Sequence, residues 1–165
     1  MKLRRENIVA ALALLVVAAA LPSAIMDTID TGRVYLFSSQ FLEELPQRFT
    51  GPGRLRFILQ PLLAILLGVR SGLADASAGN PPYLFGLLVH SGRRRELLRS
   101  GAAAVGNLLA AGIVLDVVFQ LVIYRAVHPG AALVIGPILI TVPYALSRAL
   151  TTRVARSRLN PRRRA

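Results

Sequence analysis

The stretch LRFILQPLLAILLGVRSGLA, residues 55–74, decides how this chain folds. A helix needs about 20 mostly apolar residues to cross roughly 30 Å of hydrocarbon. The uncharged part, from Phe57 to Val69, is too short for a span. The stretch reaches spanning length only if Arg56 and Arg70 extend their charged groups toward opposite interfaces. Whether it crosses the bilayer sets the side on which every later segment lies.

The composition favours a polytopic membrane protein. Of the 165 residues, 54% are hydrophobic and 17% are charged, and the mean hydropathy is +0.55. This leaves too little polar surface for a soluble domain of the same length, and the apolar content also excludes a disordered chain. The absence of Cys excludes disulfides, thiolate catalysis and thiolate-bound metals.

Three other runs have spanning length: residues 8–25 and 131–147 carry no charge, and residues 101–124 carry only Asp116. The first run follows basic residues, as does the apolar part of a cleaved signal peptide. Because Pro22 gives a poor cleavage site, we expect an uncleaved span. The sequence therefore predicts four spans over about 8–25, 55–74, 101–124 and 131–147.

The distribution of basic residues predicts the orientation. If residues 55–74 cross, then the N-terminus, the segment from Arg70 to Arg99 and the tail 148–165 share one side, with fifteen of the twenty Lys and Arg residues. Short loops rich in Lys and Arg stay in the cytoplasm. We therefore predict an all-α polytopic membrane protein, a single integral membrane domain over residues 1–165 with both termini in the cytoplasm. The plasma (inner) membrane of a prokaryote is the expected location.

One segment of the outer connection, about 34–49, is expected to form an amphipathic helix. Its apolar residues recur at spacings of three and four, with polar residues opposite them. This pattern is typical of an interfacial helix lying on the outer leaflet, or of a helix packed over the mouths of the spans. Pro46 should end or kink it. The apolar residues are Val34, Phe37, Phe41, Leu45 and Phe49.

A second in-plane segment is expected inside the cytoplasmic loop 75–100. The sequence Gly79-Asn80-Pro81-Pro82 is expected to interrupt helical structure, and the short apolar stretch Tyr83 to Val89 follows. Asn80 suits a helix N-cap and Pro81 the first helical position. The tyrosine and phenylalanine of this stretch suit the depth of the lipid headgroups.

Asp116 is the only ionisable residue well inside a predicted span, about 12 Å from the outer end of its helix. A carboxylate there costs roughly 2.5–3.5 kcal/mol, so it should be protonated, paired or facing a polar cavity. Gln120 shares its face, and Gln60 and Thr141 lie at similar depths. We predict an intramembrane polar cluster of Asp116, Gln120, Gln60 and Thr141. It would handle protons or cations, contact a polar ligand, or simply hold helices together by hydrogen bonds.

Small residues recur at every fourth position of the third span, at Ala102, Gly106 and Ala110. This spacing lets helix backbones approach closely. It predicts tight packing of the third span, within the bundle or against another subunit.

Two basic clusters are candidate contacts for anionic lipid headgroups, at roughly 1 kcal/mol per residue near the surface. The alternative is that they only set the orientation. Because no aromatic residues are interleaved with them, we expect no nucleic-acid partner. The clusters are Arg93, Arg94, Arg95 and Arg162, Arg163, Arg164.

The sequence shows no phosphate loop, dinucleotide fingerprint, His-Glu-x-x-His motif or nucleophile elbow. We therefore expect no catalytic, metal or cofactor site, and the bilayer with its anionic lipids as one partner. The favoured function is a non-enzymatic accessory or structural subunit, as a homo-oligomer or in a larger membrane complex. One alternative is a small oligomeric proton- or cation-coupled transporter that uses Asp116. Another is a membrane enzyme acting on lipid or isoprenoid substrates.

Overall fold

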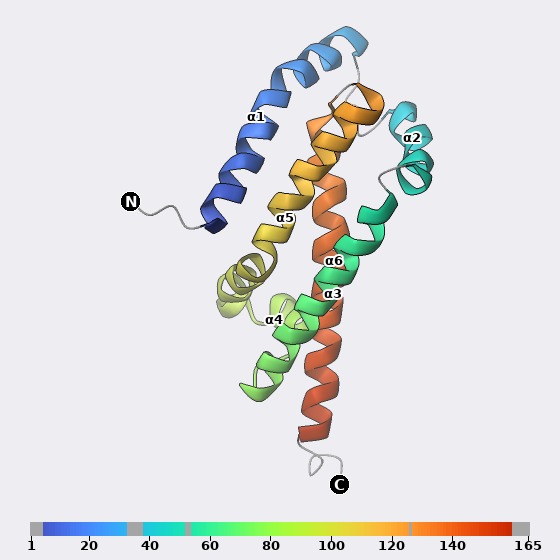
Figure 1. Cartoon of the computed structure of the whole chain (residues 1–165). Helices are drawn as coiled ribbons and strands as arrows, with labels where there is room; N and C mark the ends of the chain where they lie inside the picture. The colour runs from blue at the N-terminus through green and yellow to red at the C-terminus, as the bar shows by residue number, and fades with distance from the viewer. Residues whose placement is uncertain (1–4, 33–37, 52–53, 126, 160–165) are drawn as a thin grey trace. The chain divides into compact units, whose positions relative to one another are not determined.

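A computed structural model describes residues 5–32, 38–51, 54–125 and 127–159. These residues form helices and contain no strand, which confirms the all-α prediction. Figure 1 shows the helices coloured in chain order, and a 3-10 turn, Ser91–Arg93, precedes the fifth α-helix. The α-helices are α1 (Arg5–Thr31), α2 (Ser39–Thr50), α3 (Arg54–Ser77), α4 (Tyr83–Val89), α5 (Arg94–Tyr124) and α6 (Pro129–Leu159).

Helices α1, α3, α5 and α6 are each long and apolar enough to cross a membrane, which confirms the prediction of four spans. The decisive one is α3, whose 24 residues extend over about 36 Å at 1.5 Å per residue. That length exceeds the hydrocarbon thickness. The chain is therefore a small integral membrane protein, and its orientation stays a prediction of the charge distribution.

The last two helices extend further than the apolar runs from which they were predicted. Helix α5 already begins at Arg94, and α6 continues to Leu159, each with 31 residues. The start of α5 agrees with the expectation from the sequence that Arg93 to Arg99, at the end of the loop 75–100, form the first turns of this helix. Much of the segment 148–165, expected as a tail, is also helical. Arginine is a good helix former, and its long side chain reaches out of the apolar zone without ending the helix.

Helix α2 forms within the predicted amphipathic segment, although Val34 and Phe37 lie outside the described residues. The Ser38 hydroxyl accepts the Phe41 N–H at 3.2 Å and so caps its start. Pro46 lies inside the helix and does not end it, because proline has a helical φ and removes only one backbone hydrogen bond. At its other end Phe49 stacks on Phe57 of α3, with ring centroids 4.5 Å apart.

The turn after α3 differs from the predicted arrangement in the role of Asn80. Gly79 adopts φ 72, its N–H binds the carbonyl of Ala76 at 3.2 Å, and the Asn80 N–H binds that of Asp75 at 2.9 Å. This is the Schellman helix end, which favours glycine. Pro82 is the N-cap residue of α4. The prediction of Asn80 as the cap was therefore wrong, because the turn directs Asn80 back to the end of α3.

The described chain divides into two compact units, one of Met1–Gln60 and Asn107–Leu139, the other of Pro61–Gly106 and Ile140–Ala165. Parts of α3, α5 and α6 belong to each unit. Each unit contains a buried cluster of charged and polar side chains, and these clusters are the candidate sites.

Candidate functional site

The first unit holds an ion pair between α3 and α5, which we call the Asp116 cluster: Arg56, Asp116 and Gln120. Asp116 is only 1% exposed. One of its oxygens, Oδ1, pairs with Nη1 of Arg56, and the other, Oδ2, accepts a hydrogen bond from Gln120 Nε2 at 2.7 Å. The carboxylate is therefore neutralised and hydrogen-bonded within the chain, as a charge inside a span must be.

Gln120 extends this cluster to the start of α6. Its Oε1 accepts the backbone N–H of His128 at 2.7 Å, and its Nε2 also approaches the His128 carbonyl at 3.4 Å. That carbonyl in turn accepts the N–H of Ala131 in the first turn of α6, at 3.0 Å. One amide side chain thus links Asp116 to the backbone that begins α6.

Arg56 has a partner that was not predicted from the sequence. It is 9% exposed and bound to Asp116. Its guanidinium lies over the rings of Phe57 and Phe119, at 4.8 and 5.6 Å from their centroids. The pair and the aromatic faces compensate for the lost hydration of the charge. Because its charge is paired, Arg56 is less costly in a membrane-spanning α3 than an unpaired arginine would be.

The other two residues of the predicted cluster, Gln60 and Thr141, belong to different units. Gln60 is buried at 5% exposure, one helical turn after Arg56. Its Nε2 and the Nε of Arg56 find no hydrogen-bond acceptor among the described residues. Thr141 is exposed and belongs to the second unit. Of the four predicted residues, the structure thus joins Asp116 to Gln120 by a hydrogen bond.

The second unit holds the Arg148 cluster: Asp75 of α3, Tyr83 of α4, Ser100 of α5, and Tyr144 and Arg148 of α6. Arg148 is 3% exposed. It donates from Nε to Asp75 Oδ2 at 2.6 Å and from Nη2 to Asp75 Oδ1 at 3.0 Å. The paired geometry is the strong, bidentate form of an arginine–carboxylate contact. Nη2 also donates to Ser100 Oγ at 3.1 Å, which brings α5 into the cluster.

Two tyrosines complete the surroundings of the guanidinium. Arg148 Nη1 donates to the Tyr144 hydroxyl at 2.9 Å, and that hydroxyl donates to Ser71 Oγ at 3.3 Å. The guanidinium carbon lies 4.4 Å from the centroid of the Tyr83 ring. Such stacking suits arginine, whose planar cation is weakly hydrated.

Asn80 ties the turn after α3 to the helices around it. Its Nδ2 lies 3.4 Å from Asp75 Oδ1, its Oδ1 accepts a hydrogen bond from Arg93 at 3.2 Å, and its backbone carbonyl accepts one from Arg156 at 3.1 Å. The Schellman turn places Asn80 where it can make all three contacts. The polar network therefore links α3, the start of α5 and the end of α6.

Two glycines let α3 and α6 come close enough for this network. A Cβ atom built on Gly68 would lie 2.6 Å from the Tyr144 carbonyl oxygen, and one built on Gly72 would lie 2.6 Å from that of Arg148. The hydroxyl of Thr152 donates to the Gly72 carbonyl at 3.2 Å. This is the close backbone approach that small residues at every fourth position allow.

The described residues contain no group of three or more His, Asp or Glu side chains that could hold a metal ion. Chemically, the two clusters can hold helices together. In and beside the Asp116 cluster, Arg56 Nε and Gln60 Nε2 are buried hydrogen-bond donors without an acceptor among the described residues. Neither cluster has a carboxylate without a cationic partner.

Tyr83 lies outside the spans and gives a pH-dependent prediction. Burial raises the pKa of its phenol above the ordinary 10.0; the charge of Arg148 opposes this shift, and Tyr144 and Asp75 add to it. Because the folded-state pKa is the higher one, the stabilising contribution is complete below pH 10 and is lost as the pH rises through the folded pKa. We expect a late tyrosinate signal, at a pH above 10.0, in an ultraviolet titration of the wild type and its loss in Tyr83→Phe. An unchanged late signal in that variant would assign it to another tyrosine.

The basic residues predicted to contact lipid have mixed positions. Arg93 binds Asn80 and also pairs with Glu96. Arg94 donates to the carbonyl oxygens of Leu87 and Leu88 at 2.7 and 2.9 Å and so caps the end of α4. Arg95 is exposed, and Arg162, Arg163 and Arg164 lie outside the described residues.

The whole Arg148 cluster was missed in the sequence, where Arg148 was assigned to the basic tail. Two signals point toward it. Tyr144 lies one turn before Arg148, and the four-span topology places the ends of the second and fourth spans at the same face.

Gly68 and Gly72 also have the spacing of close helix packing, which was predicted only for Ala102, Gly106 and Ala110. Of those three, Ala110 is buried, Ala102 is exposed and Gly106 has nothing within 4 Å of a built Cβ.

Comparison with known proteins provides no family for this arrangement. No protein-family model, curated protein or solved structure matches the chain. What the protein does must therefore be inferred from its own residues.

Proposed function

We propose that this integral membrane protein is a non-enzymatic accessory or structural subunit of a membrane assembly, as a homo-oligomer or within a larger complex. We place it in the plasma (inner) membrane of a prokaryote, with both termini in the cytoplasm. The proposal rests on how the chain uses its buried charges, and in particular on the pairing of Asp116.

Asp116 is the carboxylate that a proton- or cation-coupled mechanism would need, and it is committed to Arg56 and Gln120. In a carrier, such a group must change its protonation state or release a cation during the cycle. A permanent arginine partner together with the link from Gln120 to His128 supports a structural role. The Asp75–Arg148 pair serves the same purpose in the second unit.

A transporter is the second candidate, and one observation favours it. Arg56 Nε and Gln60 Nε2 are buried without acceptors among the described residues, and both belong to the face of α3 that carries the partner of Asp116. Unmatched buried donors are costly, and they cluster where a ligand or a second conformation uses them. The two functions differ in what they predict for Asp116→Asn.

In sealed proteoliposomes carrying a pH-sensitive dye, we expect no proton or sodium flux above the protein-free level for the wild type. Asp116→Asn, which keeps the side-chain shape and an acceptor for Arg56, should behave in the same way. Glu96→Gln is the matched control, because it makes the same chemical change at an exposed carboxylate of α5. Flux by the wild type that Asp116→Asn abolishes and Glu96→Gln retains would replace the accessory role by the carrier.

The assembly itself is tested by chemical cross-linking in the native membrane, followed by purification in a mild detergent and native mass spectrometry. We expect the 17.8 kDa chain to be recovered at fixed stoichiometry with another copy or with one partner. Recovery of the cross-linked sample as the monomer alone would contradict the proposal.

A further inference from the structure

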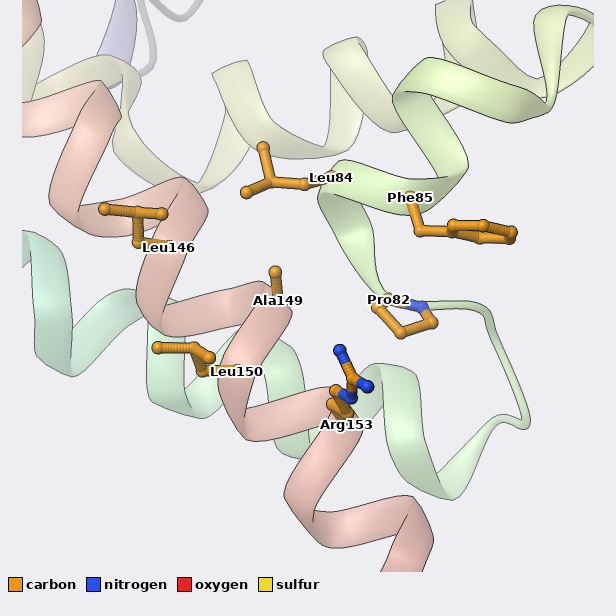
Figure 2. A pocket seen from close by; sticks show the side chains of 7 residues that line it. All are labelled: Pro82, Leu84, Phe85, Leu146, Ala149, Leu150 and Arg153. Atoms are coloured by element: carbon orange, nitrogen blue, oxygen red, sulfur yellow. The ribbon is translucent and has the colours of Figure 1, made fainter.

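A groove of about 580 Å³ lies between α4 and α6 in the second unit. Pro82, Leu84 and Phe85 line it from the α4 side. In Figure 2 the side chain of Leu84 points toward α6, whereas the ring of Phe85 points away from it in this view. From the α6 side the groove is lined by Leu146, Ala149, Leu150 and Arg153. The lining is apolar apart from the guanidinium of Arg153.

The groove changes from apolar to cationic along the axis of α6. Leu146 and Arg153 are seven residues apart, which is about 10 Å along a helix. The uncharged part of α6 ends at Ser147, so Arg153 lies about 9 Å beyond it, at the depth of the headgroups. A ligand with an apolar chain and a negatively charged head would match this gradient.

The charge of Arg153 is available for such a ligand. Among the described residues Arg153 makes no hydrogen bond or ion pair, whereas Arg148 binds Asp75 and Arg156 binds the Asn80 carbonyl. The surroundings are strongly positive, because residues 61–106 and 140–159 carry nine arginines against only Asp75 and Glu96. Positive charge at the headgroup level attracts anionic lipid.

We propose that this groove binds one anionic phospholipid, with an acyl chain along Leu146, Leu150 and Phe85 and the phosphate headgroup at Arg153. The site does not depend on the accessory role and differs from the predicted contacts at Arg93–Arg95 and Arg162–Arg164. Arg93 and Arg94 are hydrogen-bonded to other residues of the chain, whereas the guanidinium of Arg153 lines the groove.

The chain has no tryptophan, so Phe85→Trp introduces a single indole, which can be excited selectively over the tyrosines, into the groove. The full-length variant is reconstituted in phosphatidylcholine vesicles that contain brominated phosphatidylglycerol or brominated phosphatidylcholine, and quenching gives the relative binding constant. We expect phosphatidylglycerol to bind near the introduced indole about five times as tightly as phosphatidylcholine. Adding Arg153→Gln should bring this ratio close to one, and adding Arg153→Lys should retain most of it.

Two controls separate a site from general attraction. Arg158→Gln removes the same charge from α6 at a residue that lines a different groove, and it should leave the ratio measured with Phe85→Trp unchanged. Leu62→Trp reports on an exposed apolar position of α3 and should show no preference. A ratio of one for Phe85→Trp alone, or equal losses from Arg153→Gln and Arg158→Gln, would overturn the proposal.

Discussion

Replacing Arg148 by methionine should lower the free energy of unfolding by about 3–5 kcal/mol, the cost of leaving a buried charge without its partner. Asp75 would lose both hydrogen bonds from the guanidinium, and the hydroxyls of Tyr144 and Ser100 would lose a donor. The measurement is unfolding by dodecyl sulfate in mixed micelles, followed by circular dichroism.

The matched control is Arg99→Met on α5, because Arg99 is exposed and its loss should change stability by no more than about 0.5 kcal/mol. In Asp75→Leu/Arg148→Met the unpaired carboxylate is gone, and stability should largely return, since apolar pairs replace buried ion pairs well. Equal stability of Arg148→Met and Arg99→Met would show that the pair contributes nothing. If the double variant is less stable than Arg148→Met, the loss of stability in Arg148→Met comes from the lost packing of the aliphatic part of the arginine side chain.

Gly68→Ala should lower the free energy of unfolding by about 1–3 kcal/mol, the usual cost of overpacking. The added methyl group would lie 2.6 Å from the backbone carbonyl oxygen of Tyr144, which cannot rotate away as a side chain can. Helix α6 must therefore move, and the hydrogen bonds of Arg148 to Asp75 would lengthen with it. The same dodecyl sulfate titration measures the loss.

Gly106→Ala is the control for this effect, because it makes the same change inside α5 where nothing beyond the local helix backbone and the neighbouring residues lies within 4 Å of the new Cβ. Alanine stabilises a helix by up to about 1 kcal/mol relative to glycine, so this variant should be as stable as the wild type or more stable. Equal losses in the two variants would contradict close packing at Gly68.

The spans could be predicted from the sequence because length and apolarity are properties of single helices. Residues 55–74 were the hard case, and the count of basic residues on each side predicted that they cross. The structure adds the reason why they can do so, which is that Asp116 pairs with Arg56. That pairing depends on which faces of α3 and α5 meet, and hydropathy carries no information about this.

The candidate sites were only partly predictable for the same reason. Asp116 and Gln120 lie one turn apart on a single helix, so their contact followed from helical spacing. The contact between Asp75 and Arg148 joins residues 73 positions apart, and no local pattern specifies it. Arg148 also adjoins a run of other arginines, where an arginine with a structural role cannot be distinguished from those that set orientation.

The separation of Asp75 from Arg148 along the chain has a consequence for biosynthesis. A ribosome adds about 5–20 residues per second, so Arg148 is made roughly 4–15 s after its partner. Throughout that interval the carboxylate at the end of α3 must be solvated by water or lipid headgroups, because hydrocarbon does not accept an unpaired charge. Helix α3 can therefore reach its final position only after α6 has been inserted. We expect a nascent chain that is arrested before α6 to remain susceptible to proteolysis.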